Sequence, residues 1–144
     1  MKLHIITVGQ PKLPYAKLGF ETYLQRLKHT HTVRVTHLAD KYATNADKFL
    51  DAARDTYTVA LVIDGGRQFS SHELAKFLQN RELEAREVSL LIGGPDGLPS
   101  GVLQQANICW SFSKLTFPHD LAMVVLVEAL YRASAISSGH PYHH

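Results

Sequence analysis

Two segments in the last third of the chain have the composition of loops that hold a small ligand. The apolar run Leu90-Leu91-Ile92 stops at Gly93-Gly94-Pro95-Asp96-Gly97, and Phe112–Phe117 mixes aromatic, hydroxyl and apolar side chains before Pro118. Glycine lets the backbone approach a ligand closely, and proline fixes a turn. Because G-x-G-x-x-G and G-K-[ST] patterns are absent, the pattern favours a nucleoside-like ligand over one held by its phosphates.

Both segments also allow plainer interpretations. A Gly-Gly-Pro turn often ends a strand without binding anything. The alternation in Phe112–Phe117 fits a strand that continues outwards as well as a loop around an adenine. The short strand pattern before it and Pro118 after it favour the loop.

Charged and aromatic side chains near the C-terminus suggest further chemistry. Glu128 and Arg132 are spaced i,i+4 in an apolar helical pattern, which fits a half-buried ion pair or an arginine that serves an interface or active site. The tail His140-Pro141-Tyr142-His143-His144 contains three imidazoles, yet a metal site is disfavoured because no further ligands lie nearby in sequence. The tail is therefore expected to be disordered or to contact RNA through stacking and imidazole–phosphate contacts.

Strand and helix patterns alternate along the whole chain. The predicted strands are Lys2–Val8, Thr32–Leu38, Thr58–Ile63, Glu87–Ile92 and Ile108–Phe112. The predicted helices are Pro14–Lys28, Asn45–Asp55, Ser71–Asn80 with Ser71 as its N-cap, Pro99–Ala106 and Pro118–Ser137. This alternation predicts an α/β fold: one domain over residues 1–144, with a mostly parallel five-stranded sheet covered by helices on both faces.

The predicted sheet brings the candidate loops together. Ligands of such sheets bind beyond the carboxyl ends of the strands. The turns after Ile63, Ile92 and Phe112 all lie at carboxyl ends, so we expect them to form one pocket.

Composition limits the class of protein and its compartment. The net charge is +2, but residues 1–41 hold seven Lys/Arg against two acidic residues, which fits a nucleic-acid surface or a solvated helix face. The single cysteine, Cys109, cannot form an internal disulfide. No signal-peptide pattern and no apolar stretch near the length of a membrane span are recognisable, so a cytoplasmic protein without membrane contact is expected.

The last predicted helix is apolar around most of its circumference. Leu121, Val124, Val125, Leu126, Val127, Leu130 and Ile136 lie on several of its faces. A chain of 144 residues has little surface with which to cover such a helix. We therefore expect a homodimer whose interface includes it.

Three motifs in fixed order resemble the H family of large-subunit ribosomal RNA methyltransferases, a branch of the SPOUT class. They are Leu90–Gly97, Phe112–His119, and Tyr131-Arg132-Ala133 leading to His140-Pro141-Tyr142-His143. The resemblance implies a C-terminal trefoil knot, S-adenosyl-L-methionine as methyl donor, and a homodimer. It also implies methylation at N3 of a pseudouridine in 23S rRNA of the assembled ribosome, without a metal.

The resemblance assigns roles to individual residues. The cofactor site would use Val62, Gly93, Gly94, Phe112, Ser113, Lys114, Leu115, Thr116 and Phe117. Arg132 and His119 are the catalytic candidates, because N3 of the base must lose a proton, and Tyr142 and His143 are the RNA contacts. A side chain at Gly93 is expected to block the ligand while the fold stays intact.

The chain departs from the family pattern in two places. The stretch Ala39–Tyr57 is short, and His144 stands where a cationic residue is usual at the C-terminus. Two alternatives from other classes remain: a non-catalytic ribosome- or RNA-binding protein on a SPOUT scaffold, and a small nucleotide-binding α/β protein. The intact loops disfavour the first, and the missing phosphate motifs disfavour the second.

Overall fold

Five parallel strands form one sheet whose spatial order differs from their order in the chain. The computed structural model describes residues 1–144 and places the strands in the order β2-β1-β4-β3-β5. Their bounds are β1 Lys2–Val8, β2 Thr32–Leu38, β3 Tyr57–Leu61, β4 Val88–Leu91 and β5 Ile108–Trp110. Every neighbouring pair is parallel, which confirms the predicted α/β sheet.

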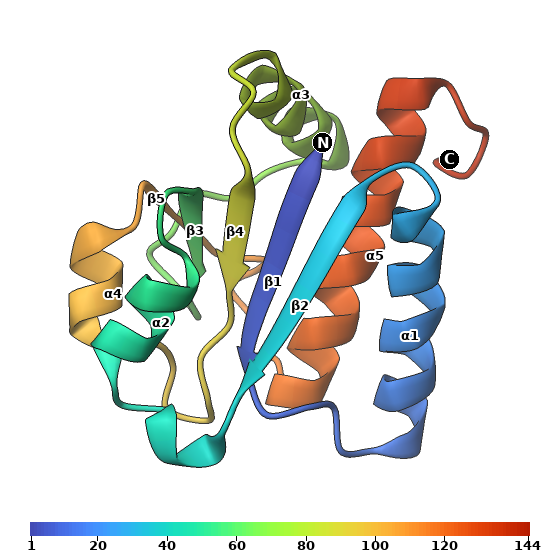
Figure 1. Ribbon diagram of the computed structural model, residues 1–144. Helices are drawn as coiled ribbons and strands as arrows, with labels where there is room; N and C mark the ends of the chain where they lie inside the picture. Colours follow the sequence, from blue (N-terminus) through green and yellow to red (C-terminus); the bar gives the residue numbers. More distant parts are fainter.

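Helices cover both faces of this sheet (Figure 1). One face carries the long helices α1 (Pro14–Lys28), α3 (Ser71–Leu83) and α5 (His119–Ser138). The other carries the short helices α2 (Ala46–Ala52) and α4 (Ser100–Gln105), and a 3-10 turn, η1 (Asp40–Tyr42), follows β2. The two cores follow the alternation of the central strand β1, because Leu3 and Ile5 pack towards the long helices while Ile6 and Val8 pack towards the short ones.

The predicted elements all exist, but several of their ends lie elsewhere. The predicted Ser71 cap was wrong: Ser70 is the N-cap of α3, and Ser70 and Glu73 form a reciprocal capping box. The hydrogen bonds from Ser70 lower the pKa of the Glu73 carboxyl. Ile63, predicted as the end of a strand, is half exposed in the loop after β3. Phe112–Phe117 is a loop, as its flanking residues indicated.

Helix α5 is only partly covered by the rest of the chain. By length and mean hydropathy (1.4), α5 is long and apolar enough to cross a membrane. The expectation that the chain contains no such segment was therefore wrong. Its buried face, which includes Met123, Leu126 and Leu130, instead packs in the core against α1 and α3. A core helix passes the same test, and Val124 and Val125 remain only half-buried.

The start of α5 is tied to the start of α1 by a buried carboxylate. Asp120 Oδ2 accepts hydrogen bonds from the backbone N–H groups of Lys12 and Leu13, at 2.9 and 2.6 Å. Further along, Gly19 of α1 allows close approach, because a Cβ there would lie 3.1 Å from Val124 Cγ1. These contacts fix the ends of both helices that lie at the carboxyl edge of the sheet.

Strand β5 lies in a slot between two parts of one earlier segment. It pairs with β3 on one side, and on the other Arg67 forms a parallel bridge with Trp110. The Gly66 N–H donates to Ser111 Oγ at 3.0 Å, and a Cβ on Gly66 would lie 2.9 Å from the Ser111 backbone nitrogen. The loop between β3 and α3 therefore arches around the end of β5. The trefoil knot implied by the resemblance stays a prediction.

Candidate functional site

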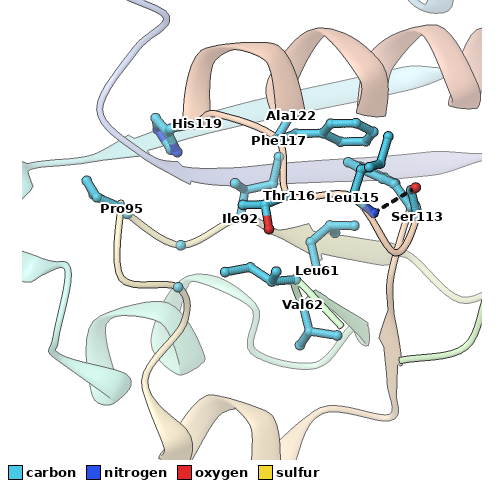
Figure 2. Close-up of a pocket in the computed structure, with 15 residues that line it drawn as sticks. Leu61, Val62, Ile92, Pro95, Ser113, Leu115, Thr116, Phe117, His119 and Ala122 are labelled. Carbon is cyan, nitrogen blue, oxygen red and sulfur yellow. Dashed lines mark hydrogen bonds between the residues drawn. The ribbon is translucent and has the colours of Figure 1, made fainter. Parts of the chain in front are cut away.

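An open cavity lies where the strands end, between three loops and the start of α5. It contains about 660 Å³ of empty space, part of it continuous with solvent, which is in the size range of small-molecule sites. Figure 2 shows the loop after β3 on one side, the Gly93–Gly97 turn on another and the Ser113–Phe117 loop above, with the Thr116 hydroxyl pointing into the space between them. The three predicted turns thus form one site.

Eight of the nine predicted cofactor residues line this cavity: Val62, Gly93, Gly94, Phe112, Ser113, Leu115, Thr116 and Phe117. The walls also include Ile92, at the strand end that the sequence analysis named, and Leu61 and Ala122, which it did not single out. Ala122 follows Pro118 by one helical turn, so only the packing of α5 against the loops brings it here. The lining is mainly apolar, with hydroxyl and backbone groups between, and matches a nucleoside better than a phosphate.

Gly93 lines the cavity, and its own turn also requires a glycine at this position. A Cβ at Gly93 would lie 2.5 Å from both the Gly97 carbonyl oxygen and the Leu98 nitrogen. The expectation that a side chain at Gly93 would block binding in an intact fold was therefore wrong, because the turn could not close. Gly94 tolerates a Cβ, which would lie 3.4 Å from Ala43 Cβ, in ordinary contact.

Lys114 is the one predicted cofactor residue outside the cavity. It lines a separate open hollow on the same loop, with about 880 Å³ of empty space that is partly continuous with solvent and with no hydrophobic residue in its wall. The hollow also contains Asp64, Gly65, Gly66 and Gln68, and it shares Ser113 with the apolar cavity. An apolar space and a polar space with one cation and one anion therefore adjoin each other.

His119 lies at the cavity, as predicted, and its hydrogen bond defines its tautomer. Its Nε2 lies 2.8 Å from the Val8 carbonyl oxygen at the end of β1. A carbonyl oxygen only accepts, so Nε2 carries a proton and, in the neutral ring, Nδ1 is left as an acceptor.

The other catalytic candidate and the predicted RNA contacts form a separate cluster. Arg132 donates to Glu128 Oε1 from Nε at 2.9 Å and from a terminal nitrogen at 2.7 Å. It also contacts His143 Nδ1 at 3.0 Å and lies 4.9 Å from the centre of the Tyr142 ring. The hydrogen bond to Glu128 raises the pKa of Arg132, so the guanidinium stays charged. The tail is thus folded back on α5.

Edge-to-face aromatic contacts and hydrogen bonds hold this tail in place. The Tyr142 ring lies 4.7 Å from that of Tyr131, and the Tyr142 hydroxyl lies 3.1 Å from Glu128 Oε1 and 3.0 Å from the Tyr23 hydroxyl. Burial raises the pKa of Tyr142, assisted by these hydrogen bonds, so its hydroxyl donates to the carboxylate. His143 packs edge-on against His72, with ring centres 5.0 Å apart. The expectation of a disordered tail does not describe this arrangement.

Within one chain the cluster and the cavity lie at opposite ends of α5. Ten residues separate Ala122 from Arg132, which corresponds to about 15 Å along a helix. Figure 1 shows the start of α5 beside the strand arrowheads and its end beside the amino end of β1. The structure therefore does not bring Arg132, Tyr142 or His143 to the cavity of their own chain.

No group of three or more His, Cys, Asp or Glu side chains gathers closely enough to hold a metal ion.

The basic residues of 1–41 are partly engaged in contacts within the protein. Arg34 pairs with Glu87 at 2.8 Å, and the Arg26 guanidinium lies over the rings of Tyr23 and Tyr131. The remaining cations of that segment are spread over β1, the loop before α1, α1 itself and η1.

Comparison with known proteins gives the family. A family described as "Predicted SPOUT methyltransferase" matches residues 1–143. The "Ribosomal RNA large subunit methyltransferase H" of Deinococcus deserti is 45% identical over 144 residues, with 99% of each chain covered. The protein of the same name from Acinetobacter baumannii (strain ATCC 17978) is 38% identical over 157 residues, again with 99% of each covered.

A solved structure agrees at the level of fold. A probable methylase family protein from Haemophilus influenzae has a TM-score of 0.60 at 10% identity, over 99% of this chain and 70% of that one. The match along nearly the whole chain and the identity to curated relatives both exceed what chance similarity produces. The chain is a methyltransferase and belongs to the ribosomal RNA large subunit methyltransferase H family of the SPOUT class.

Proposed function

We propose that this protein methylates N3 of a pseudouridine in 23S rRNA of the assembled ribosome, in the cytoplasm and without a membrane or metal, and that it uses S-adenosyl-L-methionine. The observation that carries this proposal is the apolar cavity built from all three predicted turns, in a chain of the methyltransferase family. Its size and lining suit an adenosine, and the names of the relatives supply the substrate class.

The reaction needs alignment and charge control more than covalent chemistry. The cofactor would supply a methyl group whose bond to sulfur breaks as the bond to N3 forms, while the N3 proton leaves. Holding donor and acceptor in line accounts for much of the acceleration in such displacements. His119 is the base candidate at the cavity, because its Nδ1 remains free to accept a proton.

Arg132 is proposed to act on the cavity of the partner subunit in a homodimer. It lies about 15 Å along α5 from its own cavity, yet an imide anion at N3 would benefit from a nearby cation. The half-buried apolar side chains of α5, including Val124 and Val125, offer a surface for a second copy. Two α5 helices packed antiparallel would exchange ends and carry Arg132, Tyr142 and His143 to the opposite cavity.

The polar hollow is proposed to hold the amino-acid end of the cofactor. Asp64 and Lys114 provide one anion and one cation for its ammonium and carboxylate groups, next to the cavity for its adenosine. Lys114 is then a cofactor residue, as predicted, although it lies outside the apolar cavity.

Asp64→Asn and Lys114→Gln test this placement with a truncated ligand. Each substitution is expected to weaken binding of S-adenosyl-L-methionine about 5- to 20-fold, because each removes one charge-assisted contact. Binding of 5′-methylthioadenosine, which lacks the amino-acid end, should stay within about twofold of wild type. Titration calorimetry measures both affinities. Lys28→Gln, at the far end of α1, is the control. Equal loss for both ligands would refute the placement.

The choice of acceptor is tested by radiolabelled methyl transfer. A single small domain makes few RNA contacts, so we expect efficient transfer to ribosomes and at least about 100-fold lower kcat/KM with free 23S rRNA or a pseudouridine hairpin. A hairpin with uridine in place of pseudouridine controls for the base. Equal rates on hairpin and ribosome would contradict the assembled substrate, and no transfer to any of them would contradict the proposed function.

A further inference from the structure

A basic and aromatic surface lies on α3 and the neighbouring sheet edge, away from the cavity and the C-terminal cluster. Its members, which we call the α3 basic-aromatic surface, are Tyr57, Arg67, Phe69, Lys76, Phe77, Arg81 and Arg86. None of them belongs to the basic segment 1–41. Neither the reaction nor the family motifs account for this arrangement.

Stacking positions three guanidinium groups over the rings. Arg81 lies 4.7 Å from the centre of the Tyr57 ring, and Arg86 lies over the same ring at 5.2 Å. Arg67 lies 4.4 Å from the centre of Phe69. Contact with the rings restricts where these guanidinium groups lie, and a guanidinium held in this way still has N–H groups that bind planar or tetrahedral oxyanions.

The rings form one support for these cations. Phe77 contacts Tyr57 and Phe69, with ring centres 5.7 and 5.2 Å apart, and Phe77 is itself buried in the core. Arg81 belongs to α3, whereas Arg67 and Arg86 come from the loops on either side of it, and all three guanidinium groups lie against rings that the core supports. Such preorganisation lowers the entropy that binding must overcome.

The charges of this surface are only partly neutralised. Arg81 donates to Glu84 at 3.0 Å, whereas Arg67, Lys76 and Arg86 make no ion pair. The remaining acid, Glu73, accepts the Ser70 N–H at 2.8 Å in the capping box and lines the same hollow. The surface therefore has four cations and two carboxylates, and each carboxylate already has a hydrogen-bond partner: Arg81 for Glu84 and the Ser70 N–H for Glu73.

A hollow of about 590 Å³ lies between these side chains. Arg67, Lys76 and Arg81 line it together with Asn80, so cations and an amide converge on one space. The Arg81 Nε is buried and has no hydrogen-bond acceptor, so this guanidinium is not fully satisfied within the protein.

We propose that the α3 basic-aromatic surface binds phosphates of the rRNA backbone, as a docking site separate from the place of methyl transfer. This inference rests on the proposed function, which supplies an RNA substrate. Arginine is the side chain best suited to bidentate phosphate contacts, and a net positive surface attracts the backbone whatever its base sequence. The surface therefore adds affinity and orientation, and the cavity provides the chemistry.

The double variant Arg67→Gln/Arg86→Gln tests the proposal. Both side chains are exposed, so folding should be preserved. The KM for ribosomes is expected to rise about 10-fold with kcat and affinity for S-adenosyl-L-methionine unchanged. The slope of log affinity for 23S rRNA against log salt should fall in magnitude by about 1 to 2, one phosphate contact per lost cation. Arg54→Gln is the matched control, since Arg54 lies near α2 on the other face and pairs with Asp51 at 3.1 Å.

The outcomes separate this inference from the proposed function. If wild-type protein transfers no methyl group to ribosomes, the proposed function fails. If wild-type protein is active and the double variant keeps its KM and salt slope, only the docking site is refuted. Weaker binding to ribosomes with unchanged binding to 23S rRNA would also refute it, because the surface would then contact a ribosomal protein.

Discussion

Arg132→Ala is expected to reduce methyl transfer to ribosomes by about 100- to 1,000-fold while leaving the affinity for S-adenosyl-L-methionine unchanged. Removing a group that stabilises charge developing in a transition state has effects of this size. Arg132 lies outside the cavity of its own chain, so the cofactor loses no contact there. Single-turnover transfer of radiolabelled methyl and titration calorimetry measure the two quantities separately.

The position of Arg132 also predicts that two inactive variants of this protein restore activity when they are mixed. If Arg132 serves the cavity of its partner, a chain lacking Arg132 still has a usable cavity, and a chain with a blocked cavity still has a usable Arg132. Mixing two inactive variants of these kinds should restore about one quarter of the sites, because half of the dimers are mixed and each has one complete site. No recovery in mixtures that sediment as dimers would place Arg132 outside the partner's site.

Two controls guard against a purely structural effect of the substitution. Arg132 also holds Tyr142 and His143, so its loss could release the tail. Arg132→Lys keeps the cation and should retain more activity than Arg132→Ala. Tyr142→Phe removes the hydroxyl contacts with Glu128 and Tyr23 but keeps the edge-to-face contact of the ring with Tyr131. If Tyr142→Phe lost as much activity as Arg132→Ala, tail position rather than charge would explain the result.

Ala122→Phe should abolish cofactor binding. Ala122 lines the cavity from the first turn of α5, and a phenyl ring there would occupy the space assigned to the adenosine. Affinity should fall by at least about 100-fold, or about 2.7 kcal/mol, which is comparable to the burial of one large apolar group. Calorimetry with S-adenosyl-L-methionine measures the loss. This variant is also the blocked-cavity partner for the mixing experiment.

Ala122→Ser is the matched control for size. It changes the same position without filling the cavity, so binding within about threefold of wild type is expected. Circular dichroism and thermal unfolding should show that Ala122→Phe keeps the fold, because the ring enters existing space. A folded Ala122→Phe protein with undiminished affinity would move the cofactor out of this cavity.

The fold was predictable from the sequence because its signals are local and repeated. Four strands of the parallel sheet are short, mainly apolar runs, β2 alternates between apolar and polar residues, and each helix has its own periodicity and boundary residues. The errors lie at element ends, where one hydrogen bond decides. Ser70 and Ser71 are both good caps, and only the reciprocal bond with Glu73 selects Ser70. The order of the strands is set by long-range packing, which periodicity does not report.

The position of the site was predictable, but the direction of its side chains was not. Strand ends located the three turns that form the cavity. The same sequence segment holds Ser113, which borders both spaces, and Lys114, which borders only the polar hollow, and no pattern of residue types distinguishes them. Gly93 was identified only as a glycine that a ligand requires, and the sequence did not show that Gly97 of its own turn also leaves no room for a side chain there.

The Asp120 contact and the α3 basic-aromatic surface could not be predicted from the sequence, because no motif marks the residues that form them. Asp120 binds backbone groups more than 100 residues earlier in the chain, and only the packed structure reveals this contact. The α3 basic-aromatic surface joins residues from separate segments, such as Tyr57 and Arg81, over one hollow. Net charge along the sequence pointed instead to residues 1–41, where Arg34 already has an acidic partner.

The slot around β5 has a consequence for how the chain folds and resists unfolding. Residues 108–110 pair with β3 on one side and with Arg67 on the other, and both partners lie more than 40 residues earlier in the chain. The strand can therefore pair fully only after these two partners have taken up their positions on either side of the slot. Insertion of this strand is therefore a late step that depends on contacts distant in sequence, and folding should be slow. The loop between β3 and α3 must also open before β5 can leave. When the chain is pulled from its C-terminus, we therefore expect the strongest resistance near Ser111, where Gly66 donates its hydrogen bond, and this resistance sets an unfolding rate rather than an equilibrium stability.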